Sequence, residues 1–292
     1  MTILVTGGNG QLGCALRLAS AESRHRYIFT DIEELDITSA TAIEEFFCRE
    51  KVDMVVNCAA YTAVDQAETE RETADAVNWL AVDNLARVAA TAGAVLVHIS
   101  TDYVFDGESC APYRESDPTA PINHYGAGKL RGEQVIAESG CRGITIRTQW
   151  LYSPYGKNFV KTMLRLATQQ REVRVVADQR GCPTAADDLA EAIVAILPEV
   201  VADSTLRGEV FHYASRGEAT WCEFAEEIFH VAECDCRAVA ITTDDYPTAA
   251  RRPRNSVLDC SKICERFGVE QPDWRESLRR NIERIKKNDN PL

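Results

Sequence analysis

A tyrosine and a lysine four positions apart, Tyr125 and Lys129, could carry acid–base chemistry. If residues 125–138 are helical, this spacing places both side chains on one face of the helix. A cation beside a phenol lowers the pKa of the tyrosine toward working pH, as a proton donor to an alkoxide requires. The pair alone decides little, because the same spacing arises readily by chance and is also typical of an exposed helix face.

Two features near this pair strengthen the prediction. Gly126 and Gly128 weaken the helix by on the order of 1 kcal/mol each relative to alanine, which predicts that another element approaches it closely. Residues 100–105 (Ser-Thr-Asp-Tyr-Val-Phe) directly follow a strand that ends at Ile99. A hydroxyl at this edge of a parallel sheet can hydrogen-bond a substrate carbonyl oxygen, although capping the strand is the alternative.

Three glycines at equal spacing, Gly7, Gly10 and Gly13, follow the apolar run 3–5 near the start of the chain. Between a strand and a helix, such glycines let the backbone turn tightly and approach a pyrophosphate. The N–H groups and the positive dipole end of the helix then face the phosphates. The sequence therefore predicts a dinucleotide-binding loop.

The second predicted strand, residues 27–31, ends in Asp31. A carboxylate here would accept hydrogen bonds from the adenosine ribose and repel a 2′-phosphate, which favours NADH. NADPH stays open, because Arg24 or Arg26 could offset the charge, and Asp31 could instead only cap its strand.

Strand and helix patterns alternate through the first half of the chain. The predicted helices cover residues 39–50, 74–92 and 125–138, and the later strands cover 53–58, 94–99 and 143–147. Near-continuous apolar strands between helices predict an α/β fold, a Rossmann-type doubly wound parallel sheet covered on both faces.

The pattern loosens after Trp150, where shorter elements follow one another. We predict a dinucleotide-binding Rossmann domain over residues 1–150 and a smaller C-terminal α/β substrate-binding region over 151–292. Segments around 173–200 could return to the large sheet, so this boundary is approximate.

Composition limits the partners of the chain. Its 292 residues carry a net charge of −13, which argues against nucleic acid or an anionic membrane as a partner. No apolar run reaches membrane-spanning length, and the first strand starts too early for a signal peptide, so we expect a cytoplasmic protein. The 11 cysteines lack paired zinc-site spacing and favour reduced, mostly buried thiols without a metal.

These motifs together resemble the extended short-chain dehydrogenase/reductase family and, within it, the dTDP-4-dehydrorhamnose reductases. The resemblance covers nearly the whole chain. It is carried by residues 56–65, 100–105, 123–129, 147–152, 158–159, 178–184 and 252–256.

The resemblance implies a role for each matching residue. Tyr125 would be the proton donor, with Lys129 and Thr101 as the other catalytic groups. The cofactor would be NADPH or NADH, bound by Gly7, Gly10, Gln11, Leu12, Gly13, Asp31, Asp36, Ile37, Ala60, Tyr61, Thr62, Tyr125 and Lys129. The nucleotide sugar would be bound by Thr101, Asp102, Trp150, Asn158 and Arg252.

The implied reaction is reduction of the C4 ketone of dTDP-4-dehydro-L-rhamnose to dTDP-L-rhamnose. A 4,6-dehydratase is less consistent with the sequence. The pattern of those enzymes has Asp-Glu after the threonine, whereas here Asp102 is followed by Tyr103. A Cys/His epimerase is poorly supported, and another nucleotide-sugar reductase stays open. A non-catalytic alternative is a dinucleotide-binding subunit similar to the regulatory subunit of methionine adenosyltransferase.

Two further expectations concern ions and assembly. The basic cluster Arg251, Arg252 and Arg254 is the candidate for the substrate diphosphate, unless it forms a solvated loop paired with acidic neighbours at 244–245. Some family members are magnesium-bridged dimers with an acidic residue in the first helix. This chain has none at 14–17, so we expect a monomer or homodimer without a metal.

Overall fold

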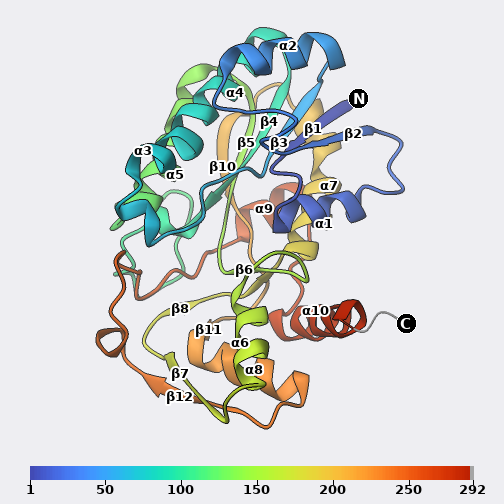
Figure 1. The fold of residues 1–292 in the computed structure, drawn as a ribbon. Coiled ribbons are helices and arrows are strands. Elements are labelled where there is room, and N and C mark those ends of the chain that lie inside the picture. The colour runs from blue at the N-terminus through green and yellow to red at the C-terminus, as the bar shows by residue number, and fades with distance from the viewer. Residues whose placement is uncertain (290–292) are drawn as a thin grey trace.

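A six-stranded parallel sheet forms the centre of the molecule (Figure 1). The computed structural model describes residues 1–289. The strand order is β10-β5-β4-β3-β1-β2, with bounds β1 (Thr2–Thr6), β2 (Arg26–Thr30), β3 (Met54–Asn57), β4 (Val95–Thr101), β5 (Arg142–Thr148) and β10 (Arg207–His212). Every neighbouring pair in this sheet is parallel. The predicted Rossmann-type sheet is confirmed.

Helices cover both faces of the sheet because its strands carry buried side chains in both directions. Along β1, Ile3 and Val5 join one hydrophobic cluster, whereas Leu4 joins the other. The first cluster is covered by α1 (Gln11–Ala19) and α7 (Ala186–Ala202), which pack together. The second is covered by α2 (Ala40–Glu50), α4 (Ala81–Ala92) and α5 (His124–Ser139).

The predicted helix over 74–92 is a composite. It begins as α3 (Arg71–Asp75), passes through a π-helical turn, η2 (Ala76–Leu80), and continues as α4 to a left-handed Gly93. Such single π-turns re-aim side chains within a helix. This turn presents Asn78 to the loop that follows β3.

A smaller region lies below the sheet in Figure 1. It contains the helices α6 (Phe159–Ala167), α8 (Trp221–Ala232) and α10 (Trp274–Asp289), whereas α9 (Ser261–Phe267) lies beside the large sheet. Its short strands pair as β7 (Glu172–Val176) with β12 (Arg237–Ile241), β8 (Arg180–Gly181) with β11 (Ala219–Thr220), and β6 (Leu151–Tyr152) with β9 (Thr184–Ala185). Of these later elements, α9 contacts β10 of the large sheet.

The chain crosses between the two regions more than once. After β7 in the smaller region, α7 packs on α1 and β10 becomes the edge strand beside β5. The boundary at residue 150 stays a prediction.

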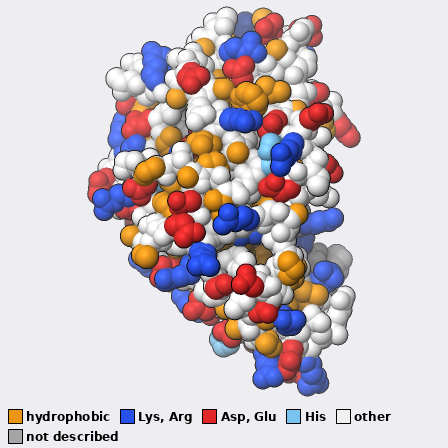
Figure 2. Space-filling view, turned by 90° about the vertical axis from the view of Figure 1, so that its left-hand side faces the viewer, with side chains coloured by type: hydrophobic (Ala, Val, Ile, Leu, Met, Phe, Trp, Pro, Cys, Tyr) orange, Lys and Arg blue, Asp and Glu red, His pale blue; other side chains and the backbone are white. Residues whose placement is uncertain are grey.

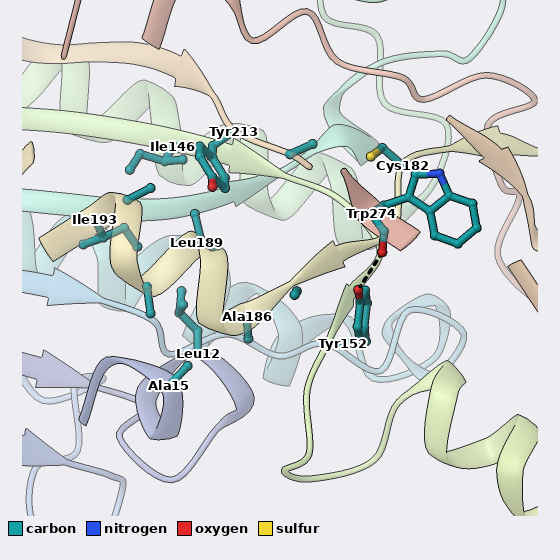
Figure 3. Packing of buried hydrophobic residues seen from close by; sticks show 14 of the residues in the cluster. Leu12, Ala15, Ile146, Tyr152, Cys182, Ala186, Leu189, Ile193, Tyr213 and Trp274 are labelled. Atoms are coloured by element: carbon teal, nitrogen blue, oxygen red, sulfur yellow. Dashed lines mark hydrogen bonds between the residues drawn. The ribbon is translucent and has the colours of Figure 1, made fainter. Parts of the chain in front are cut away.

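Buried aromatic side chains connect the two regions. Figure 3 shows Tyr152 donating a hydrogen bond to the carbonyl oxygen of Trp274, at 3.4 Å. In the same cluster, Leu12 of α1 lies beside Ala186 and Leu189 of α7. One hydrophobic cluster therefore extends from the large sheet into the smaller region.

The surface carries mixed charge. On the face drawn in Figure 2, acidic and basic side chains are interspersed with hydrophobic ones and do not gather into one basic patch. No helix within residues 1–289 is long and apolar enough to cross a membrane.

Candidate active site

A cleft of about 830 Å³ opens at the carboxyl ends of the parallel strands. Its wall is formed by the loops that follow β1 to β5, the start of α5, and the chain around 148–157. This is the edge at which open α/β sheets bind their ligands. We call this space the cleft.

The glycine loop shapes one end of the cleft. Gly7 has φ +65°, and a Cβ added to it would lie 2.7 Å from the backbone nitrogen of Ala59. A Cβ on Gly13 would lie 2.4 Å from the carbonyl oxygen of Gly7, so Gly13 packs the helix onto the loop and does not line the cleft. Gly7, Gly10, Gln11 and Leu12 do line it. No side chain caps the start of α1, which leaves its N–H groups for an anion.

The end of the cleft where the resemblance places the adenosine is acidic. Asp31, Asp36 and Ile37 all line it. Asp31 accepts a hydrogen bond from the backbone N–H of Asn9 at 3.1 Å, which ties the carboxylate to the glycine loop. Neither Arg24 nor Arg26 lines the cleft, and Arg26 pairs with Glu50 on the surface.

The middle of the cleft is formed by Ala60 and Thr62, as predicted, but Tyr61 does not reach the wall. Its backbone is held by Asn78, which accepts from the N–H at 2.9 Å and donates to the carbonyl at 3.0 Å. Its hydroxyl donates to Glu70 at 2.7 Å. The Tyr61 side chain is therefore directed away from the space that a dinucleotide would occupy.

Thr101, Tyr125 and Lys129 converge on the cleft from two elements. Thr101 ends β4, where its hydroxyl donates to Asp102 at 2.9 Å. Tyr125 stands in the first turn of α5, whose N-terminus is capped by Asn123 accepting from the N–H of Gly126 at 2.8 Å. The sequence-predicted catalytic residues thus share one wall.

Gly126 permits close approach, as the sequence predicts, whereas a Cβ on Gly128 would lie 3.5 Å from Asn78, an ordinary contact distance. A Cβ on Gly126 would lie 2.1 Å from the carbonyl oxygen of Tyr103, and one on Gly132 would lie 2.6 Å from that of Asn78. The ring of Tyr103 also packs edge-on against Tyr125, with 5.8 Å between centroids. A larger side chain at Gly126 would collide with the Tyr103 backbone, directly beside Tyr125.

The protonation of the pair differs from the sequence expectation. Burial raises the pKa of Tyr125 to about 12, while the nearby Thr101 hydroxyl acts in the opposite direction. The prediction that Lys129 lowers the pKa of this phenol is therefore wrong, because desolvation outweighs any neighbouring cation. Burial also lowers the pKa of Lys129 to about 8.

Asp102 is a buried carboxyl group that lines the cleft. Burial raises its pKa to about 7. Its Oδ1 accepts from Thr101, and its Oδ2 has no hydrogen-bond partner within the described part of the chain. A buried acceptor without a partner is costly, so this oxygen is suited to a ligand hydroxyl.

Two tryptophans form the opposite wall. Trp150 lines the cleft with a left-handed backbone, at φ +46°, and its ring stacks on Trp221 at 3.5 Å between centroids. Gly181 lies beneath, where a Cβ would be 2.4 Å from the Trp150 ring. Sequence reasoning found Trp150 but missed Trp221.

Two residues predicted to bind the sugar lie outside the cleft wall. Asn158 caps α6 and donates to the side-chain Oε1 of Gln11 at 2.9 Å, so it joins the glycine loop to the smaller region. Arg252 pairs with Asp65 at 2.5 Å and not with the acidic residues at 244–245. Within residues 1–289, the basic residues that line the cleft are Lys129 and Lys157, and Lys157 was missed.

The structure offers no assembled metal site among its described residues. Asp187 pairs with Arg284, and Asp188 pairs with Arg280 at 2.6 Å. The two carboxylates at the start of α7 are thus already engaged by arginines of α10.

A doubly wound sheet with a glycine loop at one end of its cleft and a Tyr/Lys helix at the other defines a dinucleotide-dependent oxidoreductase of the short-chain dehydrogenase/reductase class. Comparison with known proteins narrows this class. The family described as "RmlD substrate binding domain" matches residues 1–287, and the chain belongs to that family. The resemblance stated from the sequence is confirmed.

Relatives agree over nearly the full length. A dTDP-4-dehydrorhamnose reductase of Sinorhizobium fredii is 44% identical over 288 residues, covering 97% of each chain. The crystal structure of a dTDP-4-dehydrorhamnose reductase from Clostridium acetobutylicum superposes with a TM-score of 0.93 at 38% identity, covering 98% of this chain and 100% of that one. A Bacillus anthracis dTDP-4-dehydrorhamnose reductase in complex with NADP gives a TM-score of 0.91 at 36% identity, covering 97% and 99%.

Proposed function

We propose that this chain reduces the C4 ketone of dTDP-4-dehydro-L-rhamnose with NADPH or NADH and releases dTDP-L-rhamnose, the last step of dTDP-rhamnose biosynthesis. One observation carries the proposal. Thr101, Tyr125 and Lys129 converge on a cleft whose other end is a dinucleotide loop, in a chain of the reductase family. An oxidoreductase that makes this sugar would serve polysaccharide biosynthesis.

The cleft fits a dinucleotide. The uncapped start of α1 leaves its N–H groups for phosphates, and the close packing of Gly7 on Ala59 and of Gly13 on Gly7 holds the loop in this shape. When bound, the cofactor supplies the hydride that adds to the sugar carbon. The residues that would hold it, from adenine to nicotinamide ribose, are Asp36, Ile37, Asp31, Gly10, Gln11, Leu12, Ala60, Thr62 and Lys129.

Tyr125 is placed to give a proton to the sugar oxygen. Its raised pKa keeps the phenol protonated at neutral pH, which is the form that a proton donor requires. Thr101 and Lys129 stabilise the negative charge that develops on the oxygen. Because all three groups are held by β4 and α5, little reorganisation accompanies the proton transfer.

The sugar would lie between the catalytic wall and Trp150. The free Oδ2 of Asp102 accepts from a sugar hydroxyl, and the stacked indoles of Trp150 and Trp221 supply an apolar surface. Lys157 provides a cation at the rim beside Gly156, which packs against Gln11. The diphosphate of the nucleotide sugar or of the cofactor is the anion that it can attract.

A direct assay tests the proposal. Purified chain mixed with dTDP-4-dehydro-L-rhamnose should oxidise NADPH or NADH stoichiometrically and give dTDP-L-rhamnose, identified by NMR. With dTDP-glucose, which has no ketone, the NADPH or NADH should not be oxidised. Tight dinucleotide binding with no turnover of any keto-sugar, together with co-purification of a synthetase, would instead favour the regulatory subunit.

The setting of the reaction completes the proposal. We expect a cytoplasmic monomer or homodimer with no nucleic-acid or membrane partner, supported by the net charge of −13. Light scattering of the purified chain with and without EDTA distinguishes these assemblies from a magnesium-bridged dimer.

A further inference from the structure

A histidine lies directly beneath the cleft lysine. His98, on β4, is fully buried, and its Nε2 is 3.2 Å from the Nζ of Lys129. The same Nζ donates to the carbonyl oxygen of Ile99 at 2.7 Å. Both contacts come from β4, so they hold the lysine against this strand.

The proton of this imidazole is placed by its other neighbour. Asn57, at the end of β3, has its Nδ2 3.0 Å from the Nδ1 of His98. The Oδ1 of Asn57 accepts from the backbone N–H of Ala59 at 3.2 Å and from the hydroxyl of Thr6 at 2.7 Å. A backbone N–H can only donate, so the amide cannot be turned over. Nδ1 of His98 must therefore be an acceptor.

A neutral imidazole that accepts at Nδ1 carries its proton on Nε2. Burial, and secondarily the charge of Lys129, hold the pKa of His98 well below its usual range, so the ring stays neutral. Its Nε2–H therefore points at the lysine nitrogen. A neutral amine accepts this hydrogen bond, whereas an ammonium group would meet it donor to donor.

We propose that Asn57 and His98 are positioning residues for Lys129, which lock the ring with its proton toward Nζ and so oppose the charged form of the lysine while keeping the neutral amine hydrogen-bonded. This proposal rests on the proposed function only for its kinetic consequence. The arrangement keeps both protonation states of Lys129 accessible beside the phenol that loses a proton.

Other groups around Lys129 act in different directions. Glu133, one turn along α5, and Cys58, after β3, both favour the charged form. Glu133 is itself neutralised by Arg147 at 2.6 Å. Tyr125 and Asp102 face the same part of the cleft.

The carboxylate of Asp75 also lies near α5, where two other side chains contact it. Its Oδ1 lies 3.0 Å from the Nε2 of His124, and its Oδ2 pairs with Arg131 at 3.5 Å. The His98 ring is therefore the side chain in hydrogen-bond contact with Nζ that opposes protonation.

Imidazole nitrogen NMR on the intact ¹⁵N-labelled protein tests the tautomer directly. We expect His98 to show a protonated Nε2 and a bare Nδ1 that do not titrate between about pH 5.5 and 9. The resonance is assigned by its loss in His98→Gln. A proton on Nδ1, or a ring that titrates in this range, would overturn the proposal whether or not the protein reduces any sugar.

Asn57→Asp tests the link to the lysine with a nearly isosteric change. A carboxylate accepts a hydrogen bond from Nδ1–H, so His98 should change to the tautomer with its proton on Nδ1. The lone pair of Nε2 then faces Lys129. We expect the alkaline limb of kcat/KM to move up by about one pH unit or more, because the ammonium form is now favoured. His230→Gln, on the exposed end of α8, should leave the limb unchanged. A reversed tautomer with an unmoved limb would show that His98 does not control Lys129.

Discussion

Two buried polar clusters meet on α5, one turn apart, and they solve the problem of burial in opposite ways. Glu133 and Arg147 form an ion pair in which both side chains are about 5% exposed or less, with Ser100 and His212 completing the hydrogen bonds. Lys129, 1% exposed, has a carbonyl and a neutral imidazole as its hydrogen-bond partners and no carboxylate.

The difference indicates a structural role for the Glu133–Arg147 pair and a chemical role for Lys129. A buried charge that is fully paired resists any change in protonation, so the Glu133 cluster fixes β4, β5 and β10 relative to α5. A buried amine without a counter-charge can gain and lose a proton near neutral pH. The molecule thus holds a fixed charge pair behind the cleft and a labile proton at its wall.

The largest expected effect is on stability at the paired cluster. Glu133→Gln leaves the Arg147 guanidinium buried without its counter-charge and should lower the free energy of unfolding by about 3–5 kcal/mol. Urea unfolding followed by circular dichroism measures this loss. Glu50→Gln, which removes a surface partner of Arg26, should cost less than about 1 kcal/mol. Equal losses in the two variants would contradict the distinction.

At the other cluster, Lys129→Met should cost little stability but most of the activity. An apolar side chain of similar length removes a buried charge that has no ion-pair partner, so stability should stay within about 1 kcal/mol of the parent or increase. Turnover should fall at least ~100-fold, because charge stabilisation at the sugar oxygen is lost. Steady-state assays and urea unfolding on the same preparation measure both. A strongly destabilised variant would show that Lys129 is a structural residue.

The pH dependence of the reaction sharpens the comparison further. Lys129 carries its charge below its pKa of about 8 and loses it above. We expect kcat/KM to fall above about pH 8, roughly tenfold per pH unit once the amine is mostly neutral. A profile flat to pH 9.5 would show that the charged form is not needed.

A smaller effect is expected at the far end of the cleft, at Asp31. Asp31→Ala removes a carboxylate that would repel a 2′-phosphate, so the ratio of kcat/KM for NADPH to that for NADH should rise, by about tenfold. Asp83→Ala, whose parent carboxylate pairs with Arg87 on the surface of α4 and lies outside the cleft, is the matched control. An unchanged ratio for Asp31→Ala would separate this residue from cofactor choice.

Local sequence patterns predicted the parts of the site that depend on neighbours along the chain. The glycine loop, the strand that ends in Asp31, and the Tyr/Lys helix each follow from a spacing within a few residues. The close approach of Tyr103 to Gly126 confirms that helix glycines signal packing.

Contacts between distant segments could not be predicted in this way. The stacking of Trp150 on Trp221, the pairing of Arg252 with Asp65 and the strand β12 beside β7 all join residues far apart in the chain. The predicted direction of the Tyr125 pKa shift was wrong for the same reason. Burial depends on the whole fold, and it raises the pKa that a local cation would lower. His98 looked like one more residue of an apolar strand, and only its two neighbours reveal its role.

The central claim is that Tyr125 supplies the proton beside Lys129. Tyr125→Phe removes one oxygen from a rigid wall, so it should bind NADPH with the parental affinity, measured by fluorescence quenching, and lose at least ~100-fold in turnover of dTDP-4-dehydro-L-rhamnose. Tyr246→Phe, on the exposed surface, should retain full activity. Parental turnover by Tyr125→Phe would contradict the account.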